Sequence, residues 1–300
     1  MTGGKMTINK ARNGNVELAY EAEGPADGIP LLLASAGAGT QMAMWPHDLI
    51  GGLIERGFRV AKMDVRDSGL STHLTQYDNV KRRRGELAYT TRDLADDAIA
   101  VLDALGWPTA IVAGASLGGM IAQVIACEYP DRVSGLISMA STPTSSFLIN
   151  RPKIGTNLRM LKVMSGKSAD RDAEGQRWVE LFTLFATKGY QADEAHWREA
   201  GRIAFDRGLS PNGAVRQAAA LFRAGDRRKA LASLRIPALV VHGSLDRVVS
   251  PRAARATVDA MAGARLLMLP GVGHQLPRTL WPLLLDEISA TFAGAARLTA

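Results

Sequence analysis

The 300-residue sequence predicts an α/β protein with a mostly parallel sheet, helices on both faces and a helical insertion late in the chain. Short, nearly continuous apolar segments alternate with helical patterns, as in parallel sheets that are buried on both faces. The alternation is interrupted once, between Thr142 and about Leu231, where only helical patterns occur. With 47% hydrophobic residues, the chain can form a large buried core, which excludes a disordered or fibrous protein.

The predicted elements of the sheet follow in a regular order. Two strand-like segments, 6–12 and 16–23, flank the turn dipeptide Asn13-Gly14 and predict an opening hairpin. Apolar segments bounded by turn residues predict six more strands, at residues 30–35, 59–65, 110–116, 133–141, 238–244 and 264–271. Helical spacing of apolar residues predicts helices at 46–56, 91–105, 117–129, 251–262 and from about 279.

The interval without strands predicts a helical cap over one edge of the sheet. Its helical patterns include residues 173–186, 193–206 and 214–222. We therefore expect an α/β core formed by residues 1–141 and 232–300, and a cap formed by residues 142–231.

The strongest functional motif is Gly114-Ala115-Ser116-Leu117-Gly118, which follows an apolar strand and precedes a helix. In this G-x-S-x-G context the chain turns sharply and raises the serine hydroxyl above the sheet. A serine hydroxyl is a weak nucleophile at neutral pH, so it needs a base that a carboxylate orients. The motif therefore predicts an acid and a histidine downstream, each after a strand.

Two residues meet this expectation in the expected order. Asp246 follows the predicted strand 238–244, and His274 lies in a glycine-flanked loop after the next strand. The other histidines are expected to be surface or core residues; they are His47, His73, His196 and His242. Ser138–Thr142, after an earlier strand, offers no carboxylate as an alternative acid.

The developing oxyanion needs backbone N–H donors, which we expect from Leu117 and from the small-residue loop 35–39. That loop could instead hold a phosphate, but no G-x-G-x-x-G opens a helix and no G-K-S/T occurs. No His, Asp or Glu cluster has the spacing of metal ligands. We therefore expect neither a cofactor nor a metal ion.

The residues resemble the α/β-hydrolase superfamily, over essentially the whole chain apart from the predicted cap. Within it, three segments are similar to the aclacinomycin methylesterase group: Trp45-Pro46, residues 64–72 (DVRDSGLST) and residues 270–277 (PGVGHQLP). The resemblance implies Ser116 as nucleophile, Asp246 as orienting acid and His274 as base. It also implies Ala38 and Leu117 as oxyanion donors, although many relatives have His-Gly where this chain has Ala36-Gly37, which leaves Gly37 as an alternative to Ala38.

The expected activity is hydrolysis of a carboxylic ester of a bulky small molecule, with a polyketide methyl ester implied by the resemblance. A macrolide or lactone-opening esterase is the main alternative, and acyltransferases, perhydrolases and carbon–carbon bond hydrolases use the same triad. From another class, the scaffold could be a ligand receptor with little or no turnover, which a turnover number would distinguish. The predicted cap holds eight of the seventeen aromatic residues, and the helical spacing of Trp178, Phe182 and Phe185 favours core packing over a substrate wall.

The net charge of +7 lies in one part of the chain. Residues 144–230 contain sixteen Lys or Arg and nine Asp or Glu, while the remainder balances. We expect the cap arginines to form solvated helix faces and the basic run Lys81–Arg84 to form a solvated loop; these cap residues include Arg198, Arg202, Arg216 and Arg223. A minority hypothesis is weak steering of anionic esters.

The remaining predictions concern partners and compartment. A single cysteine, Cys127, excludes a disulfide scaffold and is expected to fill part of the core. No signal-like or membrane-spanning apolar segment occurs, so a cytoplasmic protein is expected. The expected partner is a small-molecule ester, with no nucleic acid and no membrane; the oligomeric state is left open.

Overall fold

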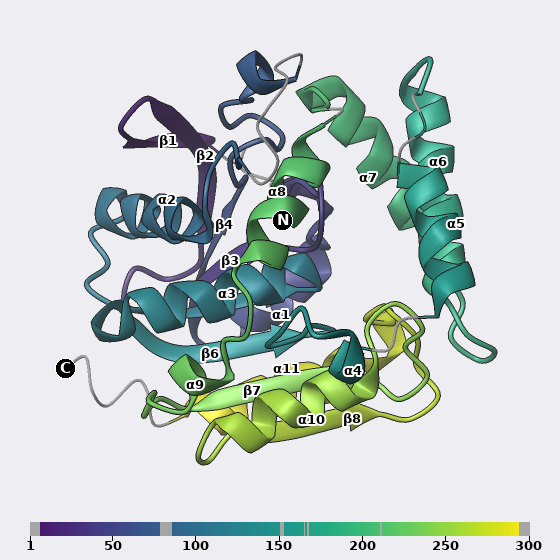
Figure 1. Ribbon diagram of the computed structural model, residues 1–300. Coiled ribbons are helices and arrows are strands. Elements are labelled where there is room, and N and C mark those ends of the chain that lie inside the picture. Colours follow the sequence, from purple (N-terminus) through teal and green to yellow (C-terminus); the bar gives the residue numbers. More distant parts are fainter. Residues whose placement is uncertain are drawn as a thin grey trace.

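The computed structural model describes residues 7–78, 86–150, 153–164, 166, 168–210 and 212–293 (Figure 1). Met6, the first residue of the predicted hairpin, and the basic run Lys81–Arg84 lie outside the described residues.

An eight-stranded sheet with the order β1-β2-β4-β3-β5-β6-β7-β8 forms the centre of the molecule. Its strands are β1 (Asn9–Asn13), β2 (Val16–Glu23), β3 (Ile29–Ser35), β4 (Phe58–Met63), β5 (Ala110–Ala115), β6 (Val133–Met139), β7 (Ala238–Gly243) and β8 (Arg265–Leu269). The pairs β1·β2 and β2·β4 are antiparallel, and all other pairs are parallel. The predicted hairpin and the mostly parallel sheet are confirmed.

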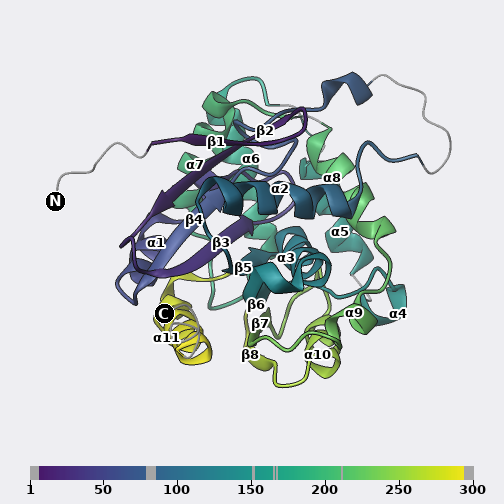
Figure 2. The same cartoon turned by 90° about the vertical axis from the view of Figure 1, so that its left-hand side faces the viewer.

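Both faces of the sheet are covered by helices (Figure 2). Helices α2 (Thr91–Ala104) and α3 (Leu117–Glu128) pack on one face, and α1 (His47–Ile54) and α11 (Trp281–Phe292) pack on the other. Helix α10 (Pro251–Ala260) lies on the same side as α3. Alternate residues of β3 contribute to opposite cores: Leu32 and Ala34 contact the α2–α3 side, whereas Leu31 and Leu33 contact the α1–α11 side. This period of two explains why the strand is apolar throughout.

Between β6 and β7 the described chain forms helices and only isolated β-bridges. These helices are α4 (Phe147–Asn150), α5 (Ile154–Met164), α6 (Arg171–Phe185), α7 (Glu194–Arg207), α8 (Gly213–Arg223) and α9 (Arg228–Leu231). We call this segment the helical insertion. The predicted helices at 173–186, 193–206 and 214–222 correspond to α6, α7 and α8, whereas α4, α5 and α9 were not predicted individually.

Buried ion pairs join the insertion to the loop after β4. Arg207 of α7 donates to Asp64 at 2.8 Å, and Arg216 of α8 donates to both carboxylate oxygens of Asp67 at 2.6 and 2.7 Å. The prediction that Arg216 lies on a solvated helix face is wrong, because its side chain is buried against Asp67 and also pairs with Asp78. Helical periodicity shows which residues share a face, but not that an acidic loop covers that face.

Candidate active site

Ser116 lies at the sharp turn between β5 and α3. Its backbone is in a left-handed region, with φ 55° and ψ −119°, which an L-residue rarely adopts. The turn brings strand and helix so close together that a Cβ at Gly114 would overlap the Gly118 carbonyl, and a Cβ at Gly118 would overlap the Ser35 carbonyl. The Ser116 N–H donates to Met139 O at 2.8 Å, which anchors the turn to β6. The geometry explains why the motif needs both glycines.

Ser116, His274 and Asp246 form a continuous hydrogen-bonded chain. Ser116 Oγ lies 3.0 Å from His274 Nε2, and His274 Nδ1 lies 2.7 Å from Asp246 Oδ2. The histidine and the carboxylate are both buried. The structure thus brings together three side chains that the sequence separates by up to 158 positions.

The Asp246 carboxylate is held by more than His274. Its Oδ1 accepts hydrogen bonds from the backbone N–H groups of Val248 and Val249 at 2.8 and 2.9 Å. His242 Nε2 lies 3.2 Å from Oδ2 and 3.0 Å from the Val249 carbonyl oxygen. Burial raises the pKa of the Asp246 carboxyl, but the charge of His274 and hydrogen bonds from both histidines outweigh it, so the net pKa lies well below the usual range for Asp. An ionised carboxylate at this place can orient His274.

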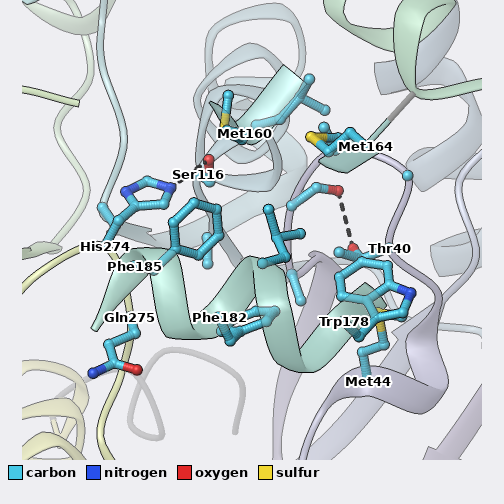
Figure 3. A pocket seen from close by; sticks show the side chains of 18 of the residues that line it. Thr40, Met44, Ser116, Met160, Met164, Trp178, Phe182, Phe185, His274 and Gln275 are labelled. Carbon is cyan, nitrogen blue, oxygen red and sulfur yellow. Dashed lines mark hydrogen bonds between the residues drawn. The ribbon is translucent and has the colours of Figure 1, made fainter. Parts of the chain in front are cut away.

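The loop that carries His274 is held by the helical insertion. The His274 N–H donates to the carbonyl oxygen of Phe185 at 3.1 Å, and the Thr187 hydroxyl donates to the Gly271 carbonyl oxygen at 2.6 Å. The Phe185 ring meets the His274 imidazole edge to face, with centroids 5.0 Å apart (Figure 3). The end of α6 therefore fixes both the backbone and the ring of His274.

The small-residue loop after β3 leaves one N–H group available near its middle. Gly37 N–H donates to Ser35 Oγ at 3.2 Å, and Gly39 N–H donates to Gln217 Oε1 at 3.1 Å. Within the described part of the chain, the Ala38 N–H has no acceptor. An oxyanion could therefore bind Ala38 N–H without first breaking a hydrogen bond, which distinguishes Ala38 from Gly37.

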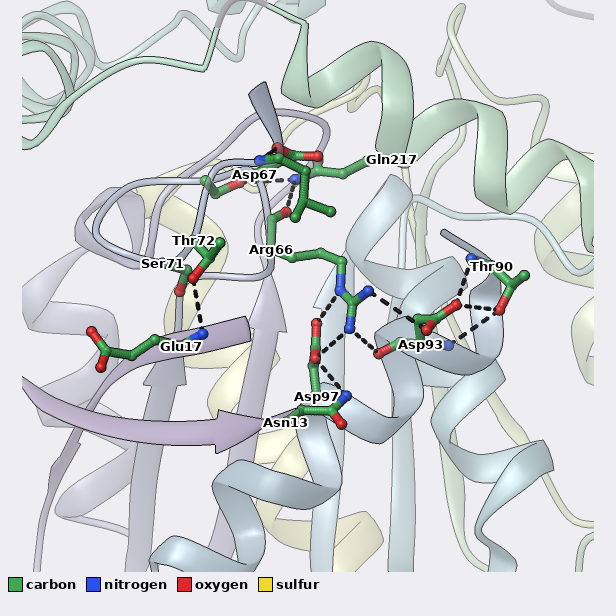
Figure 4. Close-up of polar contacts among 12 residues, drawn as sticks. Asn13, Glu17, Arg66, Asp67, Ser71, Thr72, Thr90, Asp93, Asp97 and Gln217 are labelled. Carbon is green, nitrogen blue, oxygen red and sulfur yellow. Dashed lines mark hydrogen bonds and ion pairs between the residues drawn. The ribbon is translucent and has the colours of Figure 1, made fainter. Parts of the chain in front are cut away.

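Gln217 of α8 connects this loop to the loop after β4. Its Nε2 donates to the Arg66 carbonyl oxygen at 3.0 Å and to Ser68 Oγ at 2.9 Å, and the side chain is fully buried (Figure 4). Arg66 itself forms a fork with Asp97 at 2.6 and 2.7 Å. One amide of the insertion thus contacts both loops that border the Ser116 site.

A cavity of about 1230 Å³ opens in front of Ser116 and His274. The insertion contributes most of its large apolar lining residues; they include Met160, Leu161, Met164, Trp178, Leu181, Phe182, Phe185, Trp197 and Phe222. In Figure 3, Phe185 lies beside His274, and Trp178, about two turns earlier in α6, lies near Met44. The cavity is larger than the usual pocket for a drug-sized ligand, which is about 300–1,000 Å³.

The aromatic residues of α6 both pack in a core and line the cavity. Trp178, Leu181 and Phe185 form a small core with α7 and Met44, and they also line the cavity. Phe182 stacks on Trp197 of α7, with an angle of 8° between the rings. The same side chains therefore form the core of α6 and α7 and the wall of the cavity.

Some contacts of the site were not anticipated. The role of Gln217 has no signal in the sequence, because its partner Gly39 is 178 positions away. His242 was expected to be a core histidine and is buried, but its i, i+4 spacing to Asp246 could have indicated the contact. Cys127 packs against the core as expected, and burial raises the pKa of its thiol to about 11.

Among the described residues, no group of three or more His, Cys, Asp or Glu side chains is arranged around a possible metal ion. No described helix combines the length and the apolar character needed to cross a bilayer.

Residues 29–276 match the model of the alpha/beta hydrolase fold family, and the chain therefore belongs to that family. The resemblance drawn from the motifs is confirmed at this level.

Individual relatives share less than a third of their residues with this chain. A rhodomycin D methylesterase of Streptomyces peucetius is 29% identical over 302 residues, which cover 91% of this chain and 93% of the relative. A putative carbamate hydrolase of Variovorax paradoxus is 29% identical over 259 residues, which cover 86% of this chain and 89% of that relative. Among solved structures, an enol-lactonase of Burkholderia xenovorans superposes with a TM-score of 0.72 at 21% identity, covering 95% of this chain and 100% of the lactonase. The last comparison shows the shared fold.

Proposed function

We propose that this protein is a serine carboxylic-ester hydrolase that acts on a bulky small-molecule ester. The observation that carries the proposal is the Ser116–His274–Asp246 chain, with contacts of 3.0 and 2.7 Å, at the wall of a large apolar cavity. This arrangement is what nucleophilic ester hydrolysis requires: a nucleophile, a base within hydrogen-bond reach and a group that orients the base.

In the proposed mechanism Ser116 Oγ attacks the ester carbonyl carbon while His274 Nε2 takes its proton. The oxyanion accepts hydrogen bonds from the N–H groups of Ala38 and Leu117, neither of which has an acceptor in the described part of the chain. His274 then donates the proton to the leaving alcohol, and the same imidazole activates water to cleave the acyl-enzyme. Asp246 holds the proton on Nδ1 of His274 and stabilises the imidazolium.

The substrate class follows from the size and chemistry of the cavity. Its walls are mainly aliphatic, aromatic and methionine side chains, and its volume suits a ligand larger than a simple acetate ester. Two Streptomyces relatives are rhodomycin D methylesterases, at 27% and 29% identity. We therefore propose a polyketide-like methyl ester as the first substrate to test.

The test of the chemistry uses purified protein and a short p-nitrophenyl ester. We expect multiple turnovers, covalent labelling of Ser116 by a fluorophosphonate, and loss of both in Ser116→Ala. A single slow acylation without turnover would favour a receptor instead. Absence of both hydrolysis and labelling in the folded wild-type protein would refute the proposal.

The test of the substrate class compares large and small esters. Trp178→Ala enlarges the cavity beside Met44, about two turns of α6 before the residue that packs on His274, so we expect it to change kcat/KM for bulky esters more than for p-nitrophenyl acetate. Phe185→Ala should lower kcat for both, because the Phe185 ring also packs on His274. An unchanged specificity profile in Trp178→Ala would contradict the assignment of the cavity as the substrate pocket.

A further inference from the structure

The outer side of helix α5 carries an uncovered apolar surface. Ile154, Leu158 and Leu161 recur at i, i+4 and i+7, and their side chains are 66%, 61% and 57% exposed. We call these three residues the α5 stripe. The opposite side of α5, which includes Met160 and Met164, packs on the core of α6 and lines the cavity. The helix therefore has two apolar sides, and the described part of the chain covers only one of them.

The charge around this stripe has one sign. Residues 145–169 contain five Lys or Arg and no Asp or Glu, so most of the +7 net charge lies within 25 residues. Lys153 and Arg159 are exposed and form no ion pair with any described residue. By contrast, arginines of α6 and α7 pair with carboxylates, as Arg171 does with Asp206 and Arg202 with Asp172. Two cations beside the α5 stripe, Lys153 and Arg159, are therefore not neutralised by any described carboxylate.

We propose that α5 docks on a lipid surface that carries anionic headgroups. An amphipathic helix that combines large aliphatic residues with flanking cations lies at the boundary between headgroups and acyl chains. The α5 stripe would enter that boundary, while Lys153 and Arg159 would face the phosphates. The proposal departs from the expectation of no membrane partner, which considered only spanning and signal-like segments.

Charge also decides between a lipid surface and a second copy of this chain. Pairing two copies through the α5 stripe would bring two segments of five positive charges together, and like charges oppose such an interface. An anionic lipid surface instead complements the cations and covers the apolar side chains at the same time.

The position of the stripe connects docking with the cavity. Leu161 belongs to the stripe and also lines the cavity, as does its neighbour Met160 (Figure 3). A docked α5 would place the cavity beside the lipid, so an apolar ester could enter without crossing bulk water. Docking itself does not depend on the proposed function, whereas delivery of an ester does.

The test is co-sedimentation of the full chain with vesicles of phosphatidylcholine alone and of phosphatidylcholine with an equal part of phosphatidylglycerol. We expect binding to the anionic vesicles that weakens with added salt. The double variant Lys153→Gln, Arg159→Gln should bind about 30-fold more weakly, because each cation near the surface contributes about 1 kcal/mol. Leu158→Glu should weaken binding by about tenfold or more, since it removes an apolar contact and adds a negative charge.

Controls separate docking from unfolding and from self-association. Leu283→Glu changes an exposed leucine of α11 to the same residue and should bind like the wild type. Circular dichroism should show Leu158→Glu to be folded, because Leu158 is exposed. The proposal is overturned if the wild type does not bind anionic vesicles at low salt, or if it binds both vesicle types equally. It is also overturned if Leu158→Glu binds as tightly as wild type, or if sedimentation shows that the stripe forms a dimer instead. None of these readouts uses ester hydrolysis, so failure of the proposed function leaves the test intact.

Discussion

Replacing Gln217 with methionine tests whether the helical insertion positions the loop that we propose to hold the oxyanion. Methionine has nearly the same length and shape as glutamine but forms no comparable hydrogen bonds. The substitution removes the contacts to Gly39 N–H, Arg66 O and Ser68 Oγ, at 3.1, 3.0 and 2.9 Å. Because methionine fills the same space, the substitution does not leave the cavity that a smaller residue would leave.

The expected loss of stability follows from the three partners. The Arg66 carbonyl is buried and loses a donor, which costs about 1–3 kcal/mol. Gly39 borders the cavity, where water can replace the lost acceptor, and the Ser68 hydroxyl can rotate, so each adds less. We expect Gln217→Met to be less stable by about 2–3 kcal/mol in total, measured by urea unfolding.

The expected kinetic effect is larger on kcat than on KM. Release of the Gly39 N–H frees the loop next to Ala38, and a displacement of about 1 Å at a reacting group can cost about a hundredfold in rate. We expect kcat on a p-nitrophenyl ester to fall by between about tenfold and a hundredfold, with KM changed by less than about threefold. Ser68→Ala is the matched control, because it removes one contact of Gln217 and leaves the Gly39 contact intact.

If Gln217→Met lost the expected stability but kept wild-type kcat below its unfolding transition, the amide would stabilise the fold without positioning the loop. If Ser68→Ala lowered kcat as much as Gln217→Met, the Gly39 contact would not be the cause.

Four further predictions concern charge and burial. Arg216→Met leaves the Asp67 carboxylate buried without its cationic partner and should lower the free energy of unfolding by about 3–5 kcal/mol. Arg202→Met removes an exposed ion pair and should change the free energy of unfolding by less than about 1 kcal/mol. Equal effects of the two substitutions would contradict a stabilising role for the buried Arg216–Asp67 pair. Asp246→Asn should lower kcat by about 10⁴-fold because the tautomer of the base is lost. The pKa of Asp246 in the folded protein lies below its unfolded value of about 3.9, so ionised Asp246 stabilises the fold above about pH 4. The free energy of unfolding of the wild type should therefore exceed that of Asp246→Asn by less and less as the pH falls below about 4. A difference in unfolding free energy that does not change with pH would contradict the lowered pKa. The Cys127 thiol, whose pKa is raised to about 11, should react with iodoacetamide at pH 8 much more slowly than a small free thiol; reaction at the rate of free thiol would show that Cys127 is not shielded.

The sheet and the triad could be predicted because their signals are local or depend only on chain order. Each buried strand is apolar throughout, and the elbow at Ser116 has a motif that the strand and helix around it make specific. Asp246 and His274 then follow from the rule that parallel strands end at the same edge of the sheet. The predicted strand ends differ from the observed ones by at most three residues, and the largest difference is the start of β1, predicted at residue 6 and observed at Asn9. Hydrogen-bond pairing and not composition decides where a strand ends.

The contacts of the insertion could not be predicted in the same way. Arg216 and Asp67 are 149 positions apart, and Gln217 and Gly39 are 178 positions apart. Helical periodicity places Arg216 and Gln217 on adjacent positions of α8, but it does not say which face of α8 meets the core. The charge pattern of the insertion was equally ambiguous, because an arginine in a polar helix has the same composition signal whether it is solvated or buried against a carboxylate.

These contacts change what the insertion is expected to do. It supplies most of the cavity wall, but it also holds the backbone of His274 through Phe185, and through Gln217 it holds the loop 35–39, which we propose to bind the oxyanion. A segment that only selected substrates would affect KM and specificity when altered, and a segment that also positions the base and the oxyanion donors must affect kcat as well. The two effects can be separated within one helix: Trp178 lies in the middle of α6 beside Met44, and Phe185 lies about two turns later, at the end of α6, against His274 (Figure 3). Specificity should therefore follow changes at Trp178, and rate should follow changes at Phe185, so that α6 links the choice of substrate to the geometry of catalysis.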